Sequence, residues 1–169
     1  MAIKFYTSFS LVFLAAAGTF LLSGQGAEAR IFGNGLCRDS DYPMLCSKVL
    51  KGAEFLTDPK LATGIYIKAL IDETNKAKLR AAAFGQDVKV KACVSRYEDA
   101  IDSLLKSLNN LKQNDAGSLM SNLSAVVSNY GSCADEFADA HQRSPFAATT
   151  KYNSRMASNC LALAGQIKY

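Results

Sequence analysis

Apolar residues recur at helical spacing through the second half of the chain, in two runs that step by four and three residues. The first run consists of Val90, Val94, Tyr97, Ile101, Leu104, Leu108 and Leu111. The second consists of Ala116, Leu119, Leu123, Val126 and Tyr130. Residues three and four apart share one face of an α-helix, so each run predicts a long helix. The break at 114–117 between them is short, which predicts that the two helices are antiparallel neighbours.

Other segments also have helical signals. A first short helix is predicted over 43–56, opening at a proline. Asp58 is a natural N-cap for a helix over 59–84, which Gly85 ends. A further helix is predicted to start at Cys133, after the stretch "NYGS". A last helix carries Tyr152, Met156, Asn159, Leu163 and Ile167 on one face.

Strand signals are scarce. The chain has three prolines, no long alternation of apolar and polar residues, and one Asn-Gly dipeptide, Asn34-Gly35, which lies before the first predicted helix. The patterns therefore predict an all-α protein, an up-and-down four-helix bundle with a helical appendage at the N-terminus.

The N-terminal residues have the features of a secretory signal peptide. Lys4 precedes the apolar stretch "FSLVFLAAAGTFLL", and "AEA" at 27–29 provides small residues for cleavage after Ala29. An anchoring membrane helix is the alternative, but the apolar run is shorter than the roughly 20 residues that a bilayer requires. We therefore expect a secreted mature chain over 30–169, which forms one domain and keeps no membrane segment.

The mature chain has a mild positive charge. Residues 1–29 contain one base and one acid, so the net charge of +4 is unchanged by cleavage. This charge suits adhesion to an acidic polysaccharide matrix. No Lys/Arg-rich run with interleaved aromatic residues is present, so the sequence does not indicate a nucleic-acid partner.

All five cysteines lie in the exported part, where two disulfides and one free thiol can be chosen in fifteen ways. Cys93 and Cys133 begin two predicted helices that are separated by one antiparallel helix, so a bridge between them is geometrically reasonable. Cys37 and Cys46 then form a local pair, and Cys160 is left as a buried free thiol. The sequence has no CxxC or CxxH pair and a single histidine, so we expect no metal site and no cofactor.

Catalytic motifs are missing from the sequence. It contains no GxSxG elbow and no phosphate-binding glycine loop, and its one histidine has no nucleophile in a recognisable setting. Glu98 and Asp102 could mimic a glycosidase pair, but nothing in the pattern suggests a cleft around them. We therefore expect a protein that is not an enzyme.

Five stretches in a fixed order carry a family resemblance: "LCRDSDYPMLC", "TDPKLATGIYIKAL", "ACVSRYEDAIDSLLKSL", "SNLSAVVSNYGSCADEF" and "ASNCLALAGQI". With the spacing of four cysteines and the motifs C-x3-Y-x-D-A-I-D-x-L and S-C-x-D-x-F, the mature sequence resembles the plant invertase and pectin methylesterase inhibitor family. The resemblance implies Cys37–Cys46 and Cys93–Cys133 disulfides and a helical hairpin leading into a four-helix bundle. It also implies a secreted, non-enzymatic inhibitor of the apoplast and cell wall.

The resemblance leaves two target enzymes open. Invertase inhibitors of the family typically carry a Pro-Lys-Phe segment before the fourth cysteine, whereas residues 109–132 here contain neither proline nor phenylalanine. We therefore expect inhibition of pectin methylesterase, with the bundle covering its substrate cleft in a stoichiometric complex. Acid invertase of the cell wall or vacuole is the alternative target. Ser95 departs from the acidic residue often found at that position in the family.

One helix face is the candidate contact surface for the target. It lies opposite the first apolar run and consists of Ser95, Glu98, Asp99, Asp102 and Lys106. Carboxylates there could accept hydrogen bonds across a polar interface, although a plain solvated helix face has the same composition. Tyr97, on the apolar side, is expected in the core with its hydroxyl at the rim.

Three further features have a functional and an ordinary interpretation. Ser132 and Asp135 are expected to cap the helix starting at Cys133, with target contact as the alternative. His141 could act as a pH sensor, although an exposed histidine is the commoner case. Asn122 starts the only N-glycosylation sequon, on a predicted helix.

A different class of function is the more remote alternative. A secreted helical bundle could be a receptor ligand or a small-molecule carrier, but a carrier needs an internal cavity and the Ala-rich stretches favour close helix packing. Capture of a receptor kinase and no wall enzyme from wall extracts would overturn the inhibitor interpretation.

Overall fold

The predicted helices are present in a computed structural model, which describes residues 35–51 and 56–169. All of these belong to one compact unit, residues 32–169. Its elements are η2 (Gly35–Cys37), α1 (Pro43–Val49), α2 (Pro59–Ala82), α3 (Val88–Gln113), α4 (Ala116–Ala138) and α5 (Ala147–Ala164). The predicted signal peptide, 1–29, lies outside the described residues. No helix in the described part of the chain is long and apolar enough to cross a membrane.

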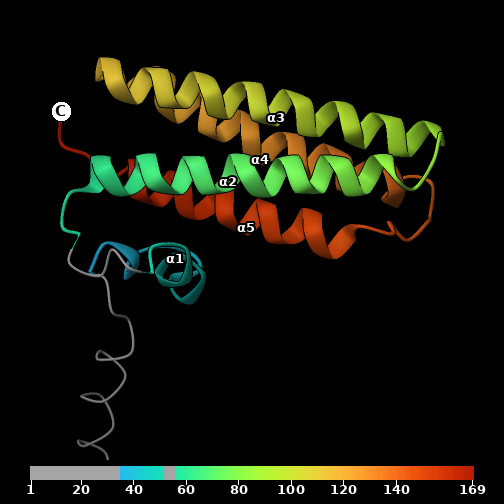
Figure 1. Cartoon of the computed structure of the whole chain (residues 1–169), viewed down its shortest axis with the longest axis horizontal. Coiled ribbons are helices and arrows are strands. Elements are labelled where there is room, and N and C mark those ends of the chain that lie inside the picture. Colours follow the sequence, from blue (N-terminus) through green and yellow to red (C-terminus); the bar gives the residue numbers. More distant parts are fainter. Residues whose placement is uncertain (1–34, 52–55) are drawn as a thin grey trace, which may run out of the picture. The chain divides into compact units, whose positions relative to one another are not determined.

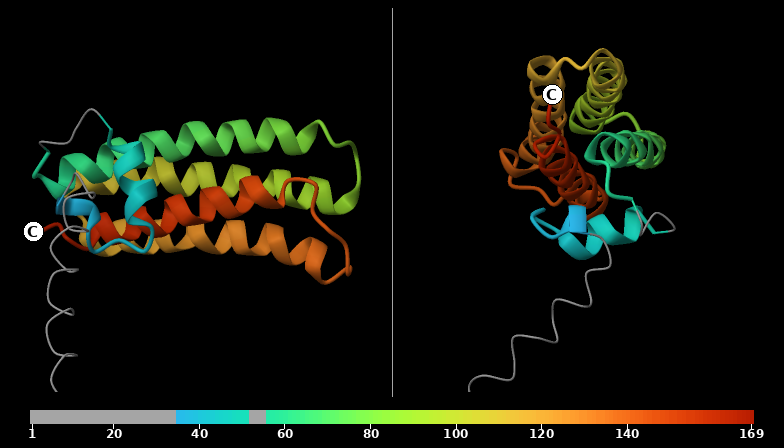
Figure 2. Two further views of the ribbon diagram at one scale, coloured as in Figure 1. Left: turned by 90° about the horizontal axis from the view of Figure 1, so that it is seen from below. Right: turned by 90° about the vertical axis from the view of Figure 1, so that its left-hand side faces the viewer.

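The four long helices, α2 to α5, form an up-and-down bundle (Figures 1 and 2). Contacts join α2 to α3, α3 to α4, α4 to α5 and α5 back to α2, and those between α3 and α4 are the most extensive. The end-on view in Figure 2 shows these helices around a common centre, with α1 at the side of the bundle. The elements η2 and α1 contact α5. The predicted fold class is confirmed.

Three aspartates start three of the long helices. The side chain of Asp58 accepts a hydrogen bond from the Lys60 N–H at 2.8 Å, Asp87 accepts from the Lys89 N–H at 2.8 Å, and Asp115 accepts from the Ser118 N–H at 3.0 Å. Each bond satisfies one of the N–H groups that the first turn of a helix leaves without a partner. The predicted cap at Asp58 is confirmed, and the cap at Asp87 explains why α3 starts at Val88, two residues before the apolar run.

Three of the long helices, α2, α3 and α4, are followed by a residue in the left-handed region. Gly85, after α2, has φ +106°, and Asn114, after α3, has φ 58°. His141 has φ 50°, and two hydrogen bonds close its turn, from the Gln142 N–H to the Phe137 carbonyl and from the His141 N–H to the Ala138 carbonyl. This pattern is a Schellman motif with His141 at the position that glycine usually takes. His141 therefore has a structural role at the end of α4, and its side chain is exposed, which is the commoner case. A role as a pH sensor stays the alternative hypothesis.

The predicted helix start at Cys133 is wrong. The helix α4 runs without a break from Ala116 to Ala138, so Ser132 and Asp135 lie inside it and do not cap a helix. The apolar run continues through Cys133 and Phe137 at the same spacing, and both side chains are buried. A single glycine costs a helix only about 1 kcal/mol, so Gly131 does not end one whose apolar face continues to pack.

The first helix is shorter than predicted. It ends at Val49, and the N–H of Leu50 bonds back to the Cys46 carbonyl at 3.0 Å as the C-cap. Leu56, at the end of the predicted range, is not helical, and residues 52–55 lie outside the described residues. Helices of so few residues are marginal by themselves, so the length of α1 depends on packing and on the nearby disulfide.

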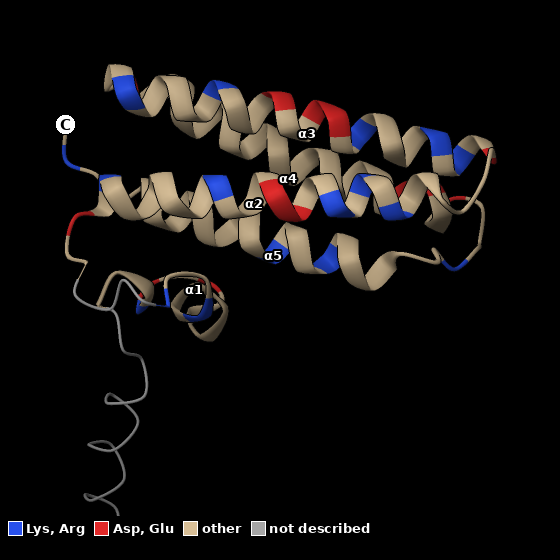
Figure 3. Ribbon diagram, in the orientation of Figure 1, with Lys and Arg blue, Asp and Glu red and all other residues tan. Residues whose placement is uncertain are grey.

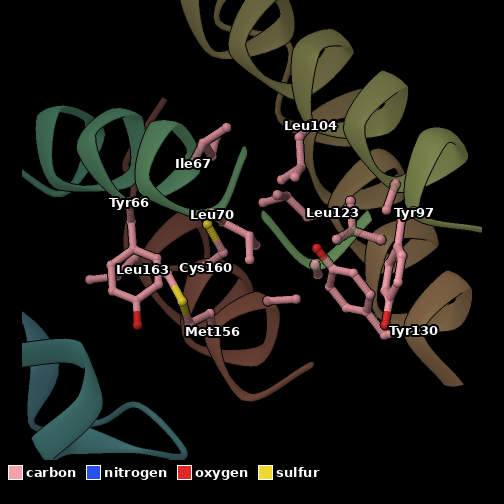
Figure 4. Close-up of a cluster of buried hydrophobic side chains, with 14 of the residues drawn as sticks. Tyr66, Ile67, Leu70, Tyr97, Leu104, Leu123, Tyr130, Met156, Cys160 and Leu163 are labelled. Atoms are coloured by element: carbon pink, nitrogen blue, oxygen red, sulfur yellow. The ribbon is translucent and has the colours of Figure 1, made fainter. Parts of the chain in front are cut away.

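The core of the bundle is built on aliphatic side chains and three buried tyrosines (Figure 4). Tyr66, Tyr97 and Tyr130 are all fully buried. The Tyr97 hydroxyl bonds to the Thr150 hydroxyl at 2.7 Å, and the Tyr130 hydroxyl bonds to that of Thr74. The hydroxyls of Tyr97 and Tyr130 therefore each have a partner inside the core, as buried hydroxyls require. The expectation that the Tyr97 hydroxyl reaches the rim is wrong.

Two disulfides are present, with the predicted pairing. Cys37 bonds to Cys46, and Cys93 of α3 bonds to Cys133 of α4. All four residues are fully buried. Cys160 is a free, buried thiol, as predicted, and its burial raises its pKa, which keeps the thiol protonated and unreactive.

Asn159 attaches the N-terminal appendage to the bundle. Its side chain is fully buried on α5, where Oδ1 accepts from the Tyr42 N–H and Nδ2 donates to the Tyr42 carbonyl, both at 2.9 Å. The same Nδ2 donates to the Tyr66 hydroxyl at 3.1 Å. Nearby, Gln166 Nε2 donates to the Leu36 carbonyl at 2.9 Å. The amide of Asn159 therefore substitutes for a backbone partner of the segment just before α1.

Asn159→Ala is expected to lower the free energy of unfolding by about 2–3 kcal/mol, because the variant leaves the polar groups of Tyr42 and Tyr66 without their partner. Chemical denaturation followed by circular dichroism measures the loss. The control is Asn75→Ala, which removes one hydrogen bond within α2 from a half-buried side chain. A loss at Asn159 no larger than at Asn75 would contradict this role.

Candidate protein-binding surface

The candidate contact residues predicted from the sequence share one exposed face of α3. Val90, Cys93, Tyr97, Ala100, Leu104, Ser107 and Leu111 are the buried residues of this helix. Ser95, Glu98, Asp99, Asp102 and Lys106 are all exposed, and we call them the α3 acidic face. Figure 3 shows acidic residues near the middle of α3 and of α2, with basic residues on either side. The structure thus brings these side chains together on one surface.

The carboxylates of the α3 acidic face have only weak partners within the chain. Lys78 Nζ of α2 lies 3.7 Å from Glu98 Oε1, and Arg96 lies 4.0 Å from Asp99. Both carboxylate side chains are more than half exposed, and exposed ion pairs of this kind contribute about 0–1 kcal/mol. A partner protein can therefore replace these pairs with its own donors at little cost.

An apolar groove lies between α2 and α3, beyond Lys106. It has a volume of about 310 Å³ and is lined by Leu61, Gly64, Ile65, Leu108 and Leu111 among others. Leu61 is 53% exposed and Ile65 is 36% exposed. Gly64 leaves space at the bottom of the groove. A Cβ at this position would fill that space and would contact Leu111 Cδ2 at 3.4 Å. We call this feature the α2–α3 groove.

Sequence analysis missed the α2–α3 groove. Leu61 and Ile65 are four residues apart, each one position before a buried residue, Ala62 and Tyr66. Such spacing shows that the two side chains share a face, but only the position of α3 shows that this face is uncovered. Exposed apolar side chains beside charged ones are typical of surfaces that bind proteins.

The remaining candidate residues lie elsewhere. Asn122 is helical and half-buried, and its Nδ2, the atom that would carry a glycan, donates to Asn110 Oδ1 at 2.9 Å. Its glycosylation stays a prediction. Within residues 35–51 and 56–169, no group of three or more His, Cys, Asp or Glu side chains is arranged to hold a metal ion.

Solved structures share this fold. A mutant form of a pectin methylesterase inhibitor from Arabidopsis matches with a TM-score of 0.67 at 16% identity, covering 79% of this chain and 95% of that one. A pectin methylesterase inhibitor from Arabidopsis thaliana matches with a TM-score of 0.61 at 14% identity, covering 85% and 99%. At these identities the likeness concerns the fold alone.

Sequence comparison supplies the family. No curated protein matches the chain significantly. A family model described as plant invertase/pectin methylesterase inhibitor matches residues 33–163, which include both disulfides, the α3 acidic face and most of α5. The chain therefore belongs to the plant invertase/pectin methylesterase inhibitor family, whose members inhibit enzymes and are not enzymes themselves.

Proposed function

We propose that this chain is a secreted inhibitor of pectin methylesterase, acting in the cell wall or apoplast. The observation that carries the choice of target is the connection between α3 and α4, which consists of Asn114 and Asp115 only. An invertase inhibitor is expected to present a Pro-Lys-Phe segment in this region, before Cys133. A two-residue turn between two long helices has no loop that could project into an invertase active site, and this favours pectin methylesterase.

The contact is proposed to use the α3 acidic face, with the α2–α3 groove beside it. The carboxylates accept hydrogen bonds from the enzyme, while Leu61 and Ile65 bury apolar area next to them. A helical bundle that lies across the mouth of the substrate cleft blocks a polysaccharide by occupying its path, so no chemistry by the inhibitor is needed.

Parallel titration of plant pectin methylesterase and cell-wall invertase with the purified protein tests the proposal. Pectin methylesterase is expected to lose activity at a one-to-one ratio, while invertase keeps its activity. If only invertase loses activity, the target is invertase and the choice of pectin methylesterase is wrong. If neither enzyme is inhibited, the proposed function fails.

The double variant Glu98→Ala, Asp99→Ala is expected to weaken inhibition by about tenfold or more, which corresponds to about 1.4 kcal/mol of binding free energy. Its thermal midpoint should stay nearly unchanged, because both side chains are exposed. The inhibition constant from a titration of the enzyme measures the effect.

The matched control for this variant is Glu136→Ala, Asp139→Ala, which removes two carboxylates from the C-terminal end of α4 and its C-cap. It makes the same change in net charge outside the α3 acidic face, so it separates a local contact from long-range attraction. If the two double variants have the same inhibition constant, the α3 acidic face is not the interface.

A further inference from the structure

A second groove, which the proposed function does not use, lies between α4 and α5. It has a volume of about 500 Å³, and we call it the α4–α5 groove. The two helices are neighbours in the bundle, as both views of Figure 2 show. The space is open because small residues line both helices there, with Gly131, Ala134 and Ala138 on α4 and Ala147 on α5. A Cβ added at Gly131 would meet no atom within 4 Å.

The charged residues at this groove all have the same sign. Arg143, Lys151 and Arg155 line it, and none of its lining residues is acidic. Among residues 35–51 and 56–169, no carboxylate forms an ion pair with any of the three. Arg155 is held over the Tyr42 ring, with its guanidinium carbon 5.1 Å from the ring centroid. These cations therefore remain available to a bound anion.

The first turn of α5 adds to the positive potential. The N-cap residue Phe146 provides no side-chain acceptor for the helix, whereas α2, α3 and α4 each have an aspartate at this position. Ala147 begins the helix and lines the groove. The positive end of a helix dipole favours an anion close to it.

The floor of the groove is apolar. Phe137 and the alanines form it together with the buried ring of Tyr130, whose hydroxyl is already bonded to Thr74. Sites for small organic ligands typically have volumes of roughly 300–1,000 Å³, apolar walls and a few placed polar groups. The α4–α5 groove has the volume, the walls and the cationic groups of such a site.

From the volume, the apolar floor and the three unpaired cations, we infer that the α4–α5 groove binds a small amphipathic organic acid. The ring or chain of the ligand lies against Ala134 and Phe137, and its carboxylate or sulfonate contacts Arg143 and Lys151. The site uses α4 and α5, whereas the proposed enzyme contact uses α3 and α2. The inference therefore does not depend on the proposed function.

Two fluorescent probes test the inference. 8-Anilino-1-naphthalenesulfonate has an aromatic body and one negative charge, and N-phenyl-1-naphthylamine has the same rings without the charge. The folded protein is expected to bind the sulfonate saturably, one per chain, and about tenfold more tightly than the neutral probe, because a charge-assisted contact is made only by the sulfonate. No saturable binding of the sulfonate would overturn the inference.

Variants locate the site. Ala134→Leu fills the groove and is expected to weaken binding of both probes by about tenfold or more. Arg143→Gln with Lys151→Gln is expected to weaken binding of the sulfonate by a similar factor and to leave the neutral probe unchanged. The control, Arg80→Gln with Lys48→Gln, removes one arginine from α2 and one lysine from α1, both exposed, and should change neither.

Circular dichroism and the denaturation midpoint of each variant show whether it is folded. The charge variant changes only exposed side chains, so it tests the site even if Ala134→Leu perturbs the packing. Unchanged sulfonate binding in the Arg143, Lys151 variant, or an equal loss in the Arg80, Lys48 control, would overturn the inference.

Discussion

Replacing Cys93 and Cys133 together by alanine is expected to lower the free energy of unfolding by about 4 kcal/mol, from the chain entropy of a loop of about 40 residues. The bridge joins an early turn of α3 to a late turn of α4, and its two cysteines are 40 positions apart in the sequence. The turn at Asn114 and Asp115 joins the other ends of the same two helices. The disulfide thus closes the antiparallel pair, and with it the support of the α3 acidic face.

The second disulfide is the matched control. Cys37 and Cys46 are also fully buried, but only nine positions separate them. The logarithmic dependence on loop length gives about 2.6 kcal/mol for their replacement by alanine, so the two losses should differ by about 1.3 kcal/mol. Urea denaturation in a Cys160→Ala background measures both without thiol exchange. Equal losses would contradict the assignment of the larger effect to loop length.

Alkaline pH is expected to destabilise the fold steeply. Burial raises the pKa of Tyr66, Tyr97 and Tyr130 above the usual value, although a hydrogen bond to each hydroxyl opposes part of this effect. The folded protein therefore keeps three phenolic protons that the unfolded chain releases above about pH 10. The stabilisation from these groups is complete below that pH and is lost as the pH rises towards their pKa values in the folded state.

Linkage sets the size of this effect. Each retained proton lowers the free energy of unfolding by about 1.4 kcal/mol per pH unit, so the three tyrosines together give a slope of about 4 kcal/mol per pH unit above pH 10. The Cys160 thiol adds to the slope from about pH 8.5, the usual pKa of an unfolded cysteine, because burial raises its pKa as well. Denaturation midpoints measured from pH 8 to 11.5 test the slope.

Two variants separate the tyrosines from general alkaline effects. Tyr130→Phe removes one of the four retained protons, those of three tyrosines and Cys160, and should reduce the slope above pH 10 by about 1.4 kcal/mol per pH unit, or about a quarter. The variant also lacks the hydrogen bond to Thr74. Loss of that bond lowers the stability at every pH, so the change in slope measures the missing proton alone. Thr74→Val removes the same hydrogen bond but keeps the phenolic proton of Tyr130, so it should leave the slope nearly as it is. An unchanged slope in Tyr130→Phe would contradict this explanation.

Local pattern was sufficient to predict much of the fold. The spacing of apolar residues placed α3 and the first part of α4, and Asp58 with the following proline placed the start of α2. These features succeed because helix periodicity and capping involve residues at most four apart. The wrong helix start at Cys133 shows the limit of this reasoning, since the packing of Cys133 and Phe137 outweighs the local preference of Gly131.

The candidate site was predicted in part. The α3 acidic face follows from the phase of the buried residues on one helix, so the sequence was sufficient to group its members. The α2–α3 groove and the α4–α5 groove were not predicted. Each groove is a space between two neighbouring helices, so its existence depends on how the helices pack. Arg143 lies between α4 and α5 and Lys151 and Arg155 lie on α5, so only the folded chain shows that they line one groove.

Periodicity, capping residues and cysteine spacing in the amino-acid order were enough to predict an all-α bundle and to carry the family resemblance, which implied the two bridges that the structure has. Asn159 illustrates what required the folded chain. It occupied one position on a predicted apolar face, yet its amide bonds to Tyr42, 117 residues away, and to Tyr66, 93 residues away. The amide of Asn159 gains these partners only when α2 and the segment before α1 pack against α5. The anchoring of the N-terminal segment, the hydroxyl pairs of the core and both grooves were therefore decided by packing between helices.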